Sequence, residues 1–404
     1  MAKNKKNPQN FNLANIKVVG VGGAGGHIIT RMAQKEGIKN VEFIAINTDA
    51  QDLEYTQARK KIYIGKTLTR GLGAGMNPEL GKQAAEENRS EISEALQGAD
   101  IVFITAGLGG GTGSLGSGVV ADIAREVGAL TIAVITKPFS FEGAQRMRIA
   151  QEALAQIKTK VDTLVVIPND RIFNIINKDT SLLKAFEFVD DVLKNAVQAI
   201  TELIVSPGII NLDFADIKAV MKDAGAAIIG IGVTSGAERA INAVNMAINS
   251  PLLETSIDGA KGVLFSVSGG RDLKMSEIQT IAKIISDTVD PGAKVIFGAY
   301  HDKKLKKGAL KVTLIATNFN GSVATKSETL SANLFSSTAP SAEVKTTVHN
   351  TVSTPLASPA LLSKELSKED FKKDKDIDKN AVPKKKPTDM WDIPTFLRRN
   401  RRDQ

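Results

Sequence analysis

The sequence predicts an α/β protein in which a parallel-sheet domain is joined by one long central helix to a second, smaller α/β domain. Three observations support this prediction. Short β-branched runs alternate with stretches of helical period in the first half of the chain, one long amphipathic stretch follows them, and a different alternation comes after it. At 404 residues the chain is long enough to form two domains with sizeable cores.

The first half of the chain carries short apolar runs, rich in Val and Ile, that are typical of buried strands. Stretches of helical period separate most of these runs. This alternation predicts a parallel sheet that is covered by helices on both faces. The expected strands are Ile16–Val21, Val41–Ile46, Ile101–Thr105, Leu130–Ile135 and Leu164–Ile167.

A long amphipathic helix is predicted from Leu182 to about Val205, because apolar residues recur there at three- and four-residue steps. Ser206-Pro207-Gly208 ends it. The apolar positions are Leu183, Phe186, Val189, Leu193, Val197, Ile200 and Ile204.

The chain after this helix alternates again, with a rhythm that predicts a smaller mixed α/β domain. Helices are expected at 216–222, 237–248 and 275–288, and strands at 226–233, 262–267, 294–299 and 310–316.

The last part of the chain changes in composition. From 321 to 386, Ser, Thr, Ala, Pro and Lys dominate, so too little apolar surface is available to offset chain entropy and a disordered tail is expected. The only Trp lies beyond it, in a compact apolar peptide that ends in a basic cluster. Such a peptide on a disordered tether is typical of a docking motif that orders on binding.

Charge and composition exclude several classes of protein. The formal net charge is +8, but most of the excess lies at the two ends, and the residues between them are nearly neutral. A specific nucleic-acid partner is therefore not expected. No stretch is long and apolar enough to span a bilayer. The absence of cysteine rules out disulfides and thiolate metal sites, and the cytoplasm is the expected compartment.

Three glycine-rich loops lie at apparent strand ends, namely Gly20–Gly26, Gly71–Pro78 and Ala106–Gly118. A single loop of this kind is more often a tight turn than a ligand site. However, ligands of open α/β sheets bind outside the carboxyl ends of the strands, and three glycine loops at that edge are hard to explain as turns. Backbone N–H groups in such loops, together with helix N-termini, can hold phosphates.

The pattern of these loops favours a mononucleotide triphosphate. A Walker P-loop requires GxxxxGK[ST], and the nearest string, residues 60–67, lacks the leading glycine. A Rossmann oxidoreductase would explain the first loop, but it gives the other two no role.

Ordered motifs run through residues 16–320. They are IKVVGVGGAGG, NTDAQ at 47–51, GLGAG followed by Asn77-Pro78-Glu79, GGGTGS at 109–114, TKPFSFEG with Arg146, IPND at 167–170 and NLDFAD at 211–216. Together they resemble the FtsZ family of bacterial cell-division GTPases, within the tubulin superfamily. GGGTGS is similar to the tubulin signature loop that holds the nucleotide phosphates.

The resemblance implies a site for GTP and GDP. The phosphates would be held by Gly22, Gly23, Ala24, Gly26, Gly109, Gly110, Gly111, Thr112, Gly113 and Ser114, with Asn47 in the same site and Ala74 and Gly75 closing over the γ-phosphate. Glu142 and Arg146 would hold the ribose and the nearby phosphate. Asn169 and Asp191 would read the base, and Phe186 would stack on it, although Phe186 also fits the apolar stripe of the long helix. Mg²⁺, largely held by water, and K⁺ are the expected ions.

The resemblance implies a catalytic role for Asn211, Asp213 and Asp216, which follow the long helix. In the family this loop enters the nucleotide site of the next subunit in a head-to-tail filament and helps to position the attacking water. The residues alone allow a simpler interpretation, in which Asp213 only caps the next helix.

With this resemblance, the expected divisions are a flexible segment at 1–12, a GTP-binding domain at 13–181, a connecting helix at 182–206, a GTPase-activating domain at 207–320, a linker at 321–386 and a docking peptide at 387–404. Asp392–Arg399 resembles the family's peptide for membrane-tethering and regulatory division proteins. The implied function is a filament that forms the division ring, recruited to the inner face of the membrane at mid-cell.

The chain departs from the family at two places. The family usually continues the signature loop with Gly-Ala-Ala-Pro, whereas this chain has Leu115-Gly116-Ser117-Gly118, and Met76 stands where Ala is usual. The rate of hydrolysis and the strength of assembly are the properties that these departures put in question. A polymer that binds GTP with little turnover is the alternative function.

Overall fold

The computed structural model describes residues 14–34, 41–176, 179–205, 208–210, 212–250, 256–302 and 305–319. These residues all belong to one compact unit, 1–330. The expected terminal segments 1–12, 321–386 and 387–404 lie outside the described residues, and the proposed domain divisions stay a prediction.

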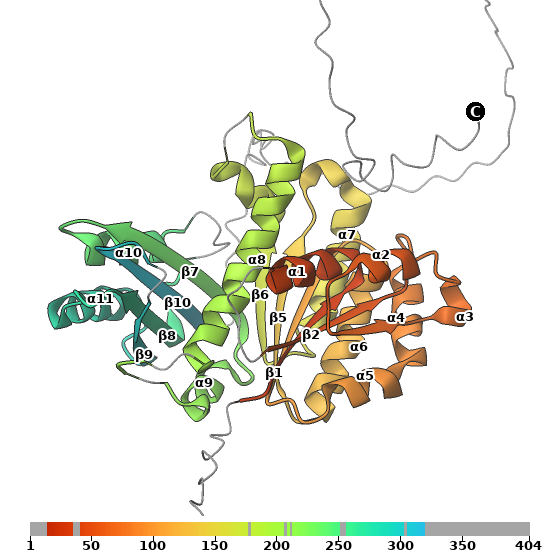
Figure 1. Ribbon diagram of the computed structural model, residues 1–404, viewed down its shortest axis with the longest axis horizontal. Helices are drawn as coiled ribbons and strands as arrows, with labels where there is room; N and C mark the ends of the chain where they lie inside the picture. Colours follow the sequence, from red (N-terminus) through yellow and green to blue (C-terminus); the bar gives the residue numbers. More distant parts are fainter. Residues whose placement is uncertain are drawn as a thin grey trace, which may run out of the picture. The chain divides into compact units, whose positions relative to one another are not determined.

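A single 10-stranded sheet, ordered β3-β2-β1-β4-β5-β6-β7-β10-β8-β9, runs through the described residues (Figure 1). The strands from β3 to β7 pair in parallel, β10 is antiparallel to β7 and β8, and β9 is parallel to β8. Their bounds are β1 Ile16–Val21, β2 Val41–Asn47, β3 Lys60–Tyr63, β4 Ile101–Gly107, β5 Leu130–Lys137, β6 Thr163–Pro168, β7 Gly225–Ser235, β8 Ala260–Gly269, β9 Lys294–His301 and β10 Ala309–Phe319.

Both faces of the central parallel strands β1, β4 and β5 are buried, as the near-continuous apolar runs predict. In β1 the alternation is direct: Val19 and Val21 pack into a core with α4 to α7, whereas Ile16 and Val18 pack into a second core with α1 and α8. The helices of this part are α1 Gly22–Gln34, α2 Ala50–Tyr55, α3 Lys66–Thr69, α4 Pro78–Glu87, α5 Arg89–Leu96, α6 Thr112–Glu126 and α7 Ala144–Ile157, with 3₁₀ turns η1 Ser140–Glu142 and η2 Asn169–Asn174.

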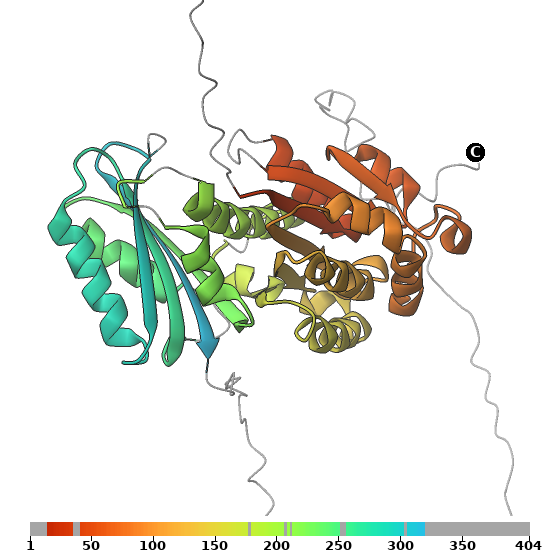
Figure 2. The same cartoon turned by 90° about the horizontal axis from the view of Figure 1, so that it is seen from below.

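Helix α8, Leu182–Val205, lies between the group of strands β1 to β6 and the group β7 to β10 (Figure 2). Its buried stripe includes Val189, Leu193, Val197 and Ile200, as predicted. Leu183 and Phe186 of the predicted stripe differ, because they are 67% and 41% exposed near the start of the helix. Beyond α8, the helices are α9 Phe214–Met221, α10 Arg239–Ile248 and α11 Met275–Thr288, and the last two pack with β8 and β10 in a third core.

The predicted fold class is confirmed: a mostly parallel sheet with helices on both faces, a long central helix and a second group of strands and helices. Strand β3 was not predicted, because only Ile62 of its four residues is buried. Among the described helices, none has the length and apolar character required to cross a membrane.

Candidate functional site

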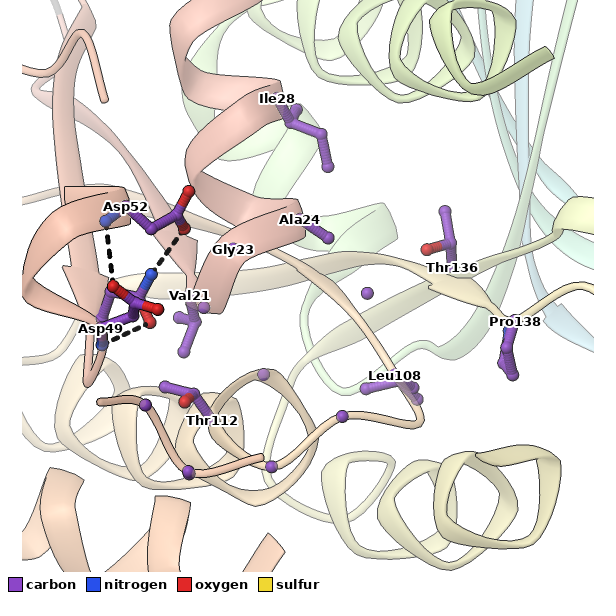
Figure 3. A pocket seen from close by; sticks show the side chains of 18 of the residues that line it. Val21, Gly23, Ala24, Ile28, Asp49, Asp52, Leu108, Thr112, Thr136 and Pro138 are labelled. Atoms are coloured by element: carbon purple, nitrogen blue, oxygen red, sulfur yellow. Dashed lines mark hydrogen bonds between the residues drawn. The ribbon is translucent and has the colours of Figure 1, made fainter. Parts of the chain in front are cut away.

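A cavity of about 510 Å³ lies at the carboxyl edge of the parallel strands. It is enclosed by the starts of α1 and α6, the loop before α4, η1, η2 and one face of α8. Figure 3 shows Ala24, at the start of α1, above Thr112, at the start of α6, with Thr136 and Pro138 on the far side. The glycine loops therefore converge where the strand order predicts a ligand.

Two helix N-termini meet at this cavity. Helix α1 begins at Gly22 directly after β1, and α6 begins at Thr112 after the glycine loop that follows β4. Gly22 has φ of +71°, and a Cβ on it would lie 3.0 Å from the backbone nitrogen of Gly113. No side chain caps α6 within the described residues. Free N–H groups at two adjoining helix starts make this end of the cavity a site for phosphates.

The glycine loop between β4 and α6 leaves room for a ligand at one glycine and none at another. A Cβ on Gly110 would meet no atom within 4 Å, and Gly110 lines the cavity. Gly111 donates its N–H to the carbonyl oxygen of Gly75 over 2.7 Å, and a Cβ on Gly111 would lie 2.8 Å from that oxygen. The loop of Ala74 and Gly75 is thus fastened to the glycine loop beside the cavity.

Three residues expected at the phosphates do not line the cavity, namely Gly26, Gly109 and Ser114. The Ser114 hydroxyl donates to the Gly110 carbonyl (2.6 Å) and accepts from the Gly109 N–H (3.0 Å), so it shapes the loop from behind. Gly26 lets α1 approach α2, because a Cβ there would lie 2.8 Å from Oγ1 of Thr56. Their support of the site is indirect in this structure.

Polar side chains from the β2–α2 turn form another wall. Asn47 Nδ2 donates to Asp52 (2.8 Å), and Asn47 Oδ1 accepts from the N–H of Thr48 (2.9 Å). Thr48 and Thr112 share a hydrogen bond of 2.6 Å between their hydroxyls, which ties this turn to α6. Burial raises the pKa of Asp52 above its usual range, against the attraction of His27. Neither Thr48 nor Asp52 was predicted as a site residue. Thr48 is part of the NTDAQ motif, and Asp52 is the residue directly after it.

Glu142 and Arg146 lie together on the cavity wall. Arg146 Nη1 is 2.6 Å from Glu142 Oε2, and the other carboxylate oxygen of Glu142 accepts from the N–H of Phe139 (2.8 Å). This pairing fixes an acceptor and a cation beside the phosphate end, which suits a ribose hydroxyl and a phosphate.

The opposite end of the cavity is shaped for a flat, polar ring. Phe186, from α8, packs edge-on against Phe139 with ring centroids 5.4 Å apart. Asn169 is only 6% exposed, and its Oδ1 has no hydrogen-bond partner among the described residues. An unpaired buried acceptor costs about 1–3 kcal/mol, so a donor on a bound base would relieve this cost.

Asp190, rather than the expected Asp191, lines the cavity. Helical geometry explains the difference: residue 190 is four positions after Phe186 and shares its face, whereas residue 191 is turned about 100° further round the helix. Asp191 lies 3.3 Å from Lys194 Nζ and 3.8 Å from Arg31 Nη1. The spacing from Phe186 is the signal that would have identified Asp190.

Two opposing effects act on the pKa of Asp190. Burial raises its pKa to about 6, and Arg31, with Nε 3.2 Å from Asp190 Oδ2, opposes that rise. Arg31 also lies 3.0 Å from Glu187, so one guanidinium on α1 faces several carboxylates on α8. A ligand that donates hydrogen bonds to Asp190 would favour its charged form.

The acidic residues after α8 lie far from this cavity. Asp213 caps α9, accepting from the N–H of Asp216 over 2.7 Å, as the simpler interpretation predicts. The last turn of α9 accepts a hydrogen bond from Thr163, the first residue of β6. Because the cavity is at the carboxyl ends of these strands, α9 lies at the opposite edge of the sheet, at the bottom of Figure 1. Asn211 lies outside the described residues.

The two departures from the family sequence have different surroundings. Leu115 is buried in the core within regular helix α6 and does not line the cavity. Gly116 and Gly118 would admit a Cβ at ordinary contact distances of 3.4 Å or more. Met76 is exposed. The cradle for phosphates therefore ends before Leu115.

Comparisons with known proteins agree with this geometry. The profile described as "Tubulin/FtsZ family, GTPase domain" matches residues 15–177, and that described as "FtsZ family, C-terminal domain" matches residues 225–320.

Solved structures similar to the chain include an empty FtsZ dimer from M. jannaschii, with 51% identity, a TM-score of 0.71, and coverage of 75% of this chain and 88% of that one. A point mutant of FtsZ from M. jannaschii gives 51% identity, a TM-score of 0.72, and coverage of 76% and 91%. CetZ2 from Haloferax volcanii shares the fold at 22% identity, with a TM-score of 0.65 and coverage of 75% and 92%.

A GTPase domain implies that a guanine nucleotide is bound, and the oxidoreductase alternative does not hold. The chain belongs to the FtsZ family of tubulin-like GTPases.

Proposed function

We propose that this chain polymerises head-to-tail into filaments. Each GTP would be hydrolysed with the help of Asp213 and Asp216 of the next subunit, which we call the acidic loop. One observation supports this proposal above the others. The cavity lies at the carboxyl ends of the parallel strands and α9 lies at their amino ends, so Asp213 and Asp216 cannot reach the nucleotide of their own subunit. Stacking subunits in one direction brings the two half-sites together.

The surfaces at the two edges favour such a contact. Phe141 is 60% exposed beside the cavity, stacked on Phe139, and Phe173 is exposed next to it. Near the acidic loop, Ile209 is 71% exposed. Two different surfaces that fit each other form a heterologous contact, and such contacts build filaments when they do not close into a ring.

The chemistry follows from what each half-site offers. The glycine loops and helix starts would hold the phosphates, and Asn169 and Asp190 would read the guanine edge, since a carboxylate accepts from N1–H and N2–H, which adenine lacks. Within the described ranges, no hydrogen bond or ion pair engages the carboxylate of Asp216, whose backbone N–H is held by Asp213. These carboxylates would orient the water that attacks the γ-phosphorus as the bond to GDP breaks.

Mg²⁺ would come with the triphosphate. No group of three or more His, Cys, Asp or Glu within the described ranges is arranged to hold a metal ion, so phosphate oxygens and water would supply most of its ligands. K⁺ is proposed as a second ion, in keeping with the resemblance.

The test measures phosphate release and light scattering together over a range of protein concentrations. We expect the rate per subunit to rise steeply once filaments form. Asp216→Asn should keep GTP binding and assembly and lose most turnover. Asp213→Asn, which retains a good helix cap, should also lose turnover, whereas Asp213→Ala should additionally destabilise α9. Normal turnover in the two Asn variants would refute hydrolysis in trans, and a rate independent of concentration would refute activation by assembly.

In the cell, we propose that these filaments form the division ring, attached to the inner face of the membrane at mid-cell through Asp392–Arg399. Deleting residues 388–404 should leave GTPase activity and filaments intact but abolish recruitment to the membrane. Normal localisation of the deletion variant would contradict this role. The alternative, a filament with little turnover, would show scattering without phosphate release.

A further inference from the structure

The end of α8 is tied to strand β9 by a side chain that no family motif quoted above includes. Tyr300, on β9, donates its hydroxyl to the carbonyl oxygen of Leu203 over 3.0 Å. Leu203 is in the last turn of α8, where helix carbonyls have no partner within the helix. Burial raises the pKa of Tyr300 to about 12, so the phenol remains a neutral donor.

The backbone after α8 is also fastened to β9. Ile210 and Ala299 form an antiparallel bridge, with N–H···O distances of 3.2 Å and 3.1 Å in the two directions. Ile209 donates to the same Ala299 carbonyl over 2.7 Å. The segment 208–210, which precedes Asp213, is therefore held against β9 by an isolated antiparallel bridge.

Two glycines make room for this arrangement. A Cβ on Gly208 would lie 2.7 Å from the Ala299 oxygen and 2.9 Å from the Tyr300 ring. A Cβ on Gly298 would lie 2.7 Å from the Tyr300 hydroxyl oxygen, because the phenol folds back along its own strand. Any other residue at either position would push the ring or the segment away.

The contact continues into the helix that carries the acids. Tyr300, Leu203 and Leu212 belong to the same buried core as Ile217 of α9. Leu212 directly precedes Asp213, whose carboxylate caps α9. A shift at Tyr300 would thus reach Asp213 and Asp216 through packed atoms.

We propose that Tyr300 is a positioning residue for GTP hydrolysis: through the end of α8 and the segment 208–210, it fixes where Asp213 and Asp216 stand in the site of the next subunit. This inference rests on the proposed hydrolysis in trans. Tyr300 is buried and does not line the cavity, so we expect it to act on turnover and not on binding.

The test replaces Tyr300 by Phe, which keeps the ring and removes one hydroxyl. We expect kcat of fully assembled filaments to fall about two- to tenfold, which corresponds to the net free energy of one hydrogen bond. The GTP affinity and the critical concentration should not change. Gly298→Ala, whose added methyl group would lie 2.7 Å from the Tyr300 hydroxyl oxygen, disturbs the same contact and should give the same selective fall in kcat.

Thr201→Val is the matched control, because Thr201 also donates a buried hydroxyl to an α8 carbonyl, that of Val197, but makes no hydrogen bond to β9 within the described part of the chain. It should retain full kcat. An unchanged kcat in Tyr300→Phe would overturn the inference, as would a parallel loss of kcat, assembly and thermal stability, which indicates a general structural role. If Asp216→Asn also retains turnover, the proposed function itself fails; if only Tyr300→Phe does, the positioning role alone fails.

Discussion

Replacing Asp190 by Asn tests whether this carboxylate reads the base. It also tests how much the buried charge of Asp190 destabilises the protein when no nucleotide is bound. The pKa of Asp190 rises from 3.8 to about 6 because the group is buried. At 1.36 kcal/mol for each pH unit, the charged form is disfavoured in the empty cavity by about 3 kcal/mol. An Asn at this position carries no charge, so the variant should be more stable than the parent at pH 7.5 by up to about 3 kcal/mol without ligand.

The same shift fixes the sign of two pH dependences. The folded chain holds the Asp190 proton more tightly than the unfolded chain, so the free energy of unfolding should fall as the pH rises from about 4 to about 6 and then level off. GTP would donate two hydrogen bonds to the charged carboxylate, so GTP binding should release a proton below pH 6. The affinity should therefore fall by up to about tenfold for each pH unit below 6.

The assay is equilibrium binding of GTP at pH 5 to 7.5, with chemical unfolding of the empty protein at the same pH values. Asp190→Asn should bind GTP about 30-fold more weakly or worse at pH 7.5, roughly 2 kcal/mol for the lost charged acceptor, and should retain only the titration of the GTP phosphates. Asp191→Asn is the control and should bind like the parent. Weak binding in Asp191→Asn with normal binding in Asp190→Asn would refute this placement of the base.

The glycines of the α6 region give a further pair of variants. Gly110→Ala should leave stability within about 0.5 kcal/mol but weaken GTP binding about tenfold or more, because its methyl group enters the cavity; unchanged binding would contradict the phosphate cradle. Gly116→Ala should raise the free energy of unfolding by about 0.5–1 kcal/mol without altering GTP binding, and a loss of stability would show that the helix cannot admit the methyl group. Glu277→Gln should cost about 1–3 kcal/mol at pH 7, because Arg239 is buried and Glu277 pairs with it over 2.7 Å. Since this ion pair lowers the pKa of Glu277, its contribution should be present above pH 4.5 and fade as the pH falls through the folded pKa; a deficit that stays constant down to pH 3 would argue against it.

Much of the fold follows from the periodicity of the sequence. The apolar run Ile16–Val21 and the amphipathic stretch from Leu182 to Val205 form the predicted strand and helix with the same bounds. Strand β3 escaped prediction because it is short and lies at the edge of the sheet, where a strand needs few apolar residues. Leu183 matches the helical stripe but is exposed, since periodicity indicates a face of a helix and not how far its neighbours extend.

The site was predictable to the level of its loops. The glycine loops after β1 and β4 had to meet at the carboxyl ends of these parallel strands, and they do. The prediction was wrong for Gly71–Gly75, which follows helix α3 and not a strand, although Gly73 and Gly75 line the same cavity. The choice between Asp190 and Asp191 required the phase of α8, which the apolar stripe contains but a short motif does not. The contact of Tyr300 with Leu203 joins positions 97 residues apart, and no local pattern points to it.

Under the proposed head-to-tail assembly, the placement of the cavity and of Asp213 and Asp216 at opposite ends of the strands would also fix the number of complete sites in a filament. A single-stranded filament of n subunits contains n − 1 complete sites, because one terminal subunit presents a nucleotide with no acidic loop above it. A dimer would hydrolyse at half the rate per subunit of a long filament, and short filaments would approach the limit as 1 − 1/n. The GTP in this terminal site would be hydrolysed more slowly than the GTP in every other site of the filament.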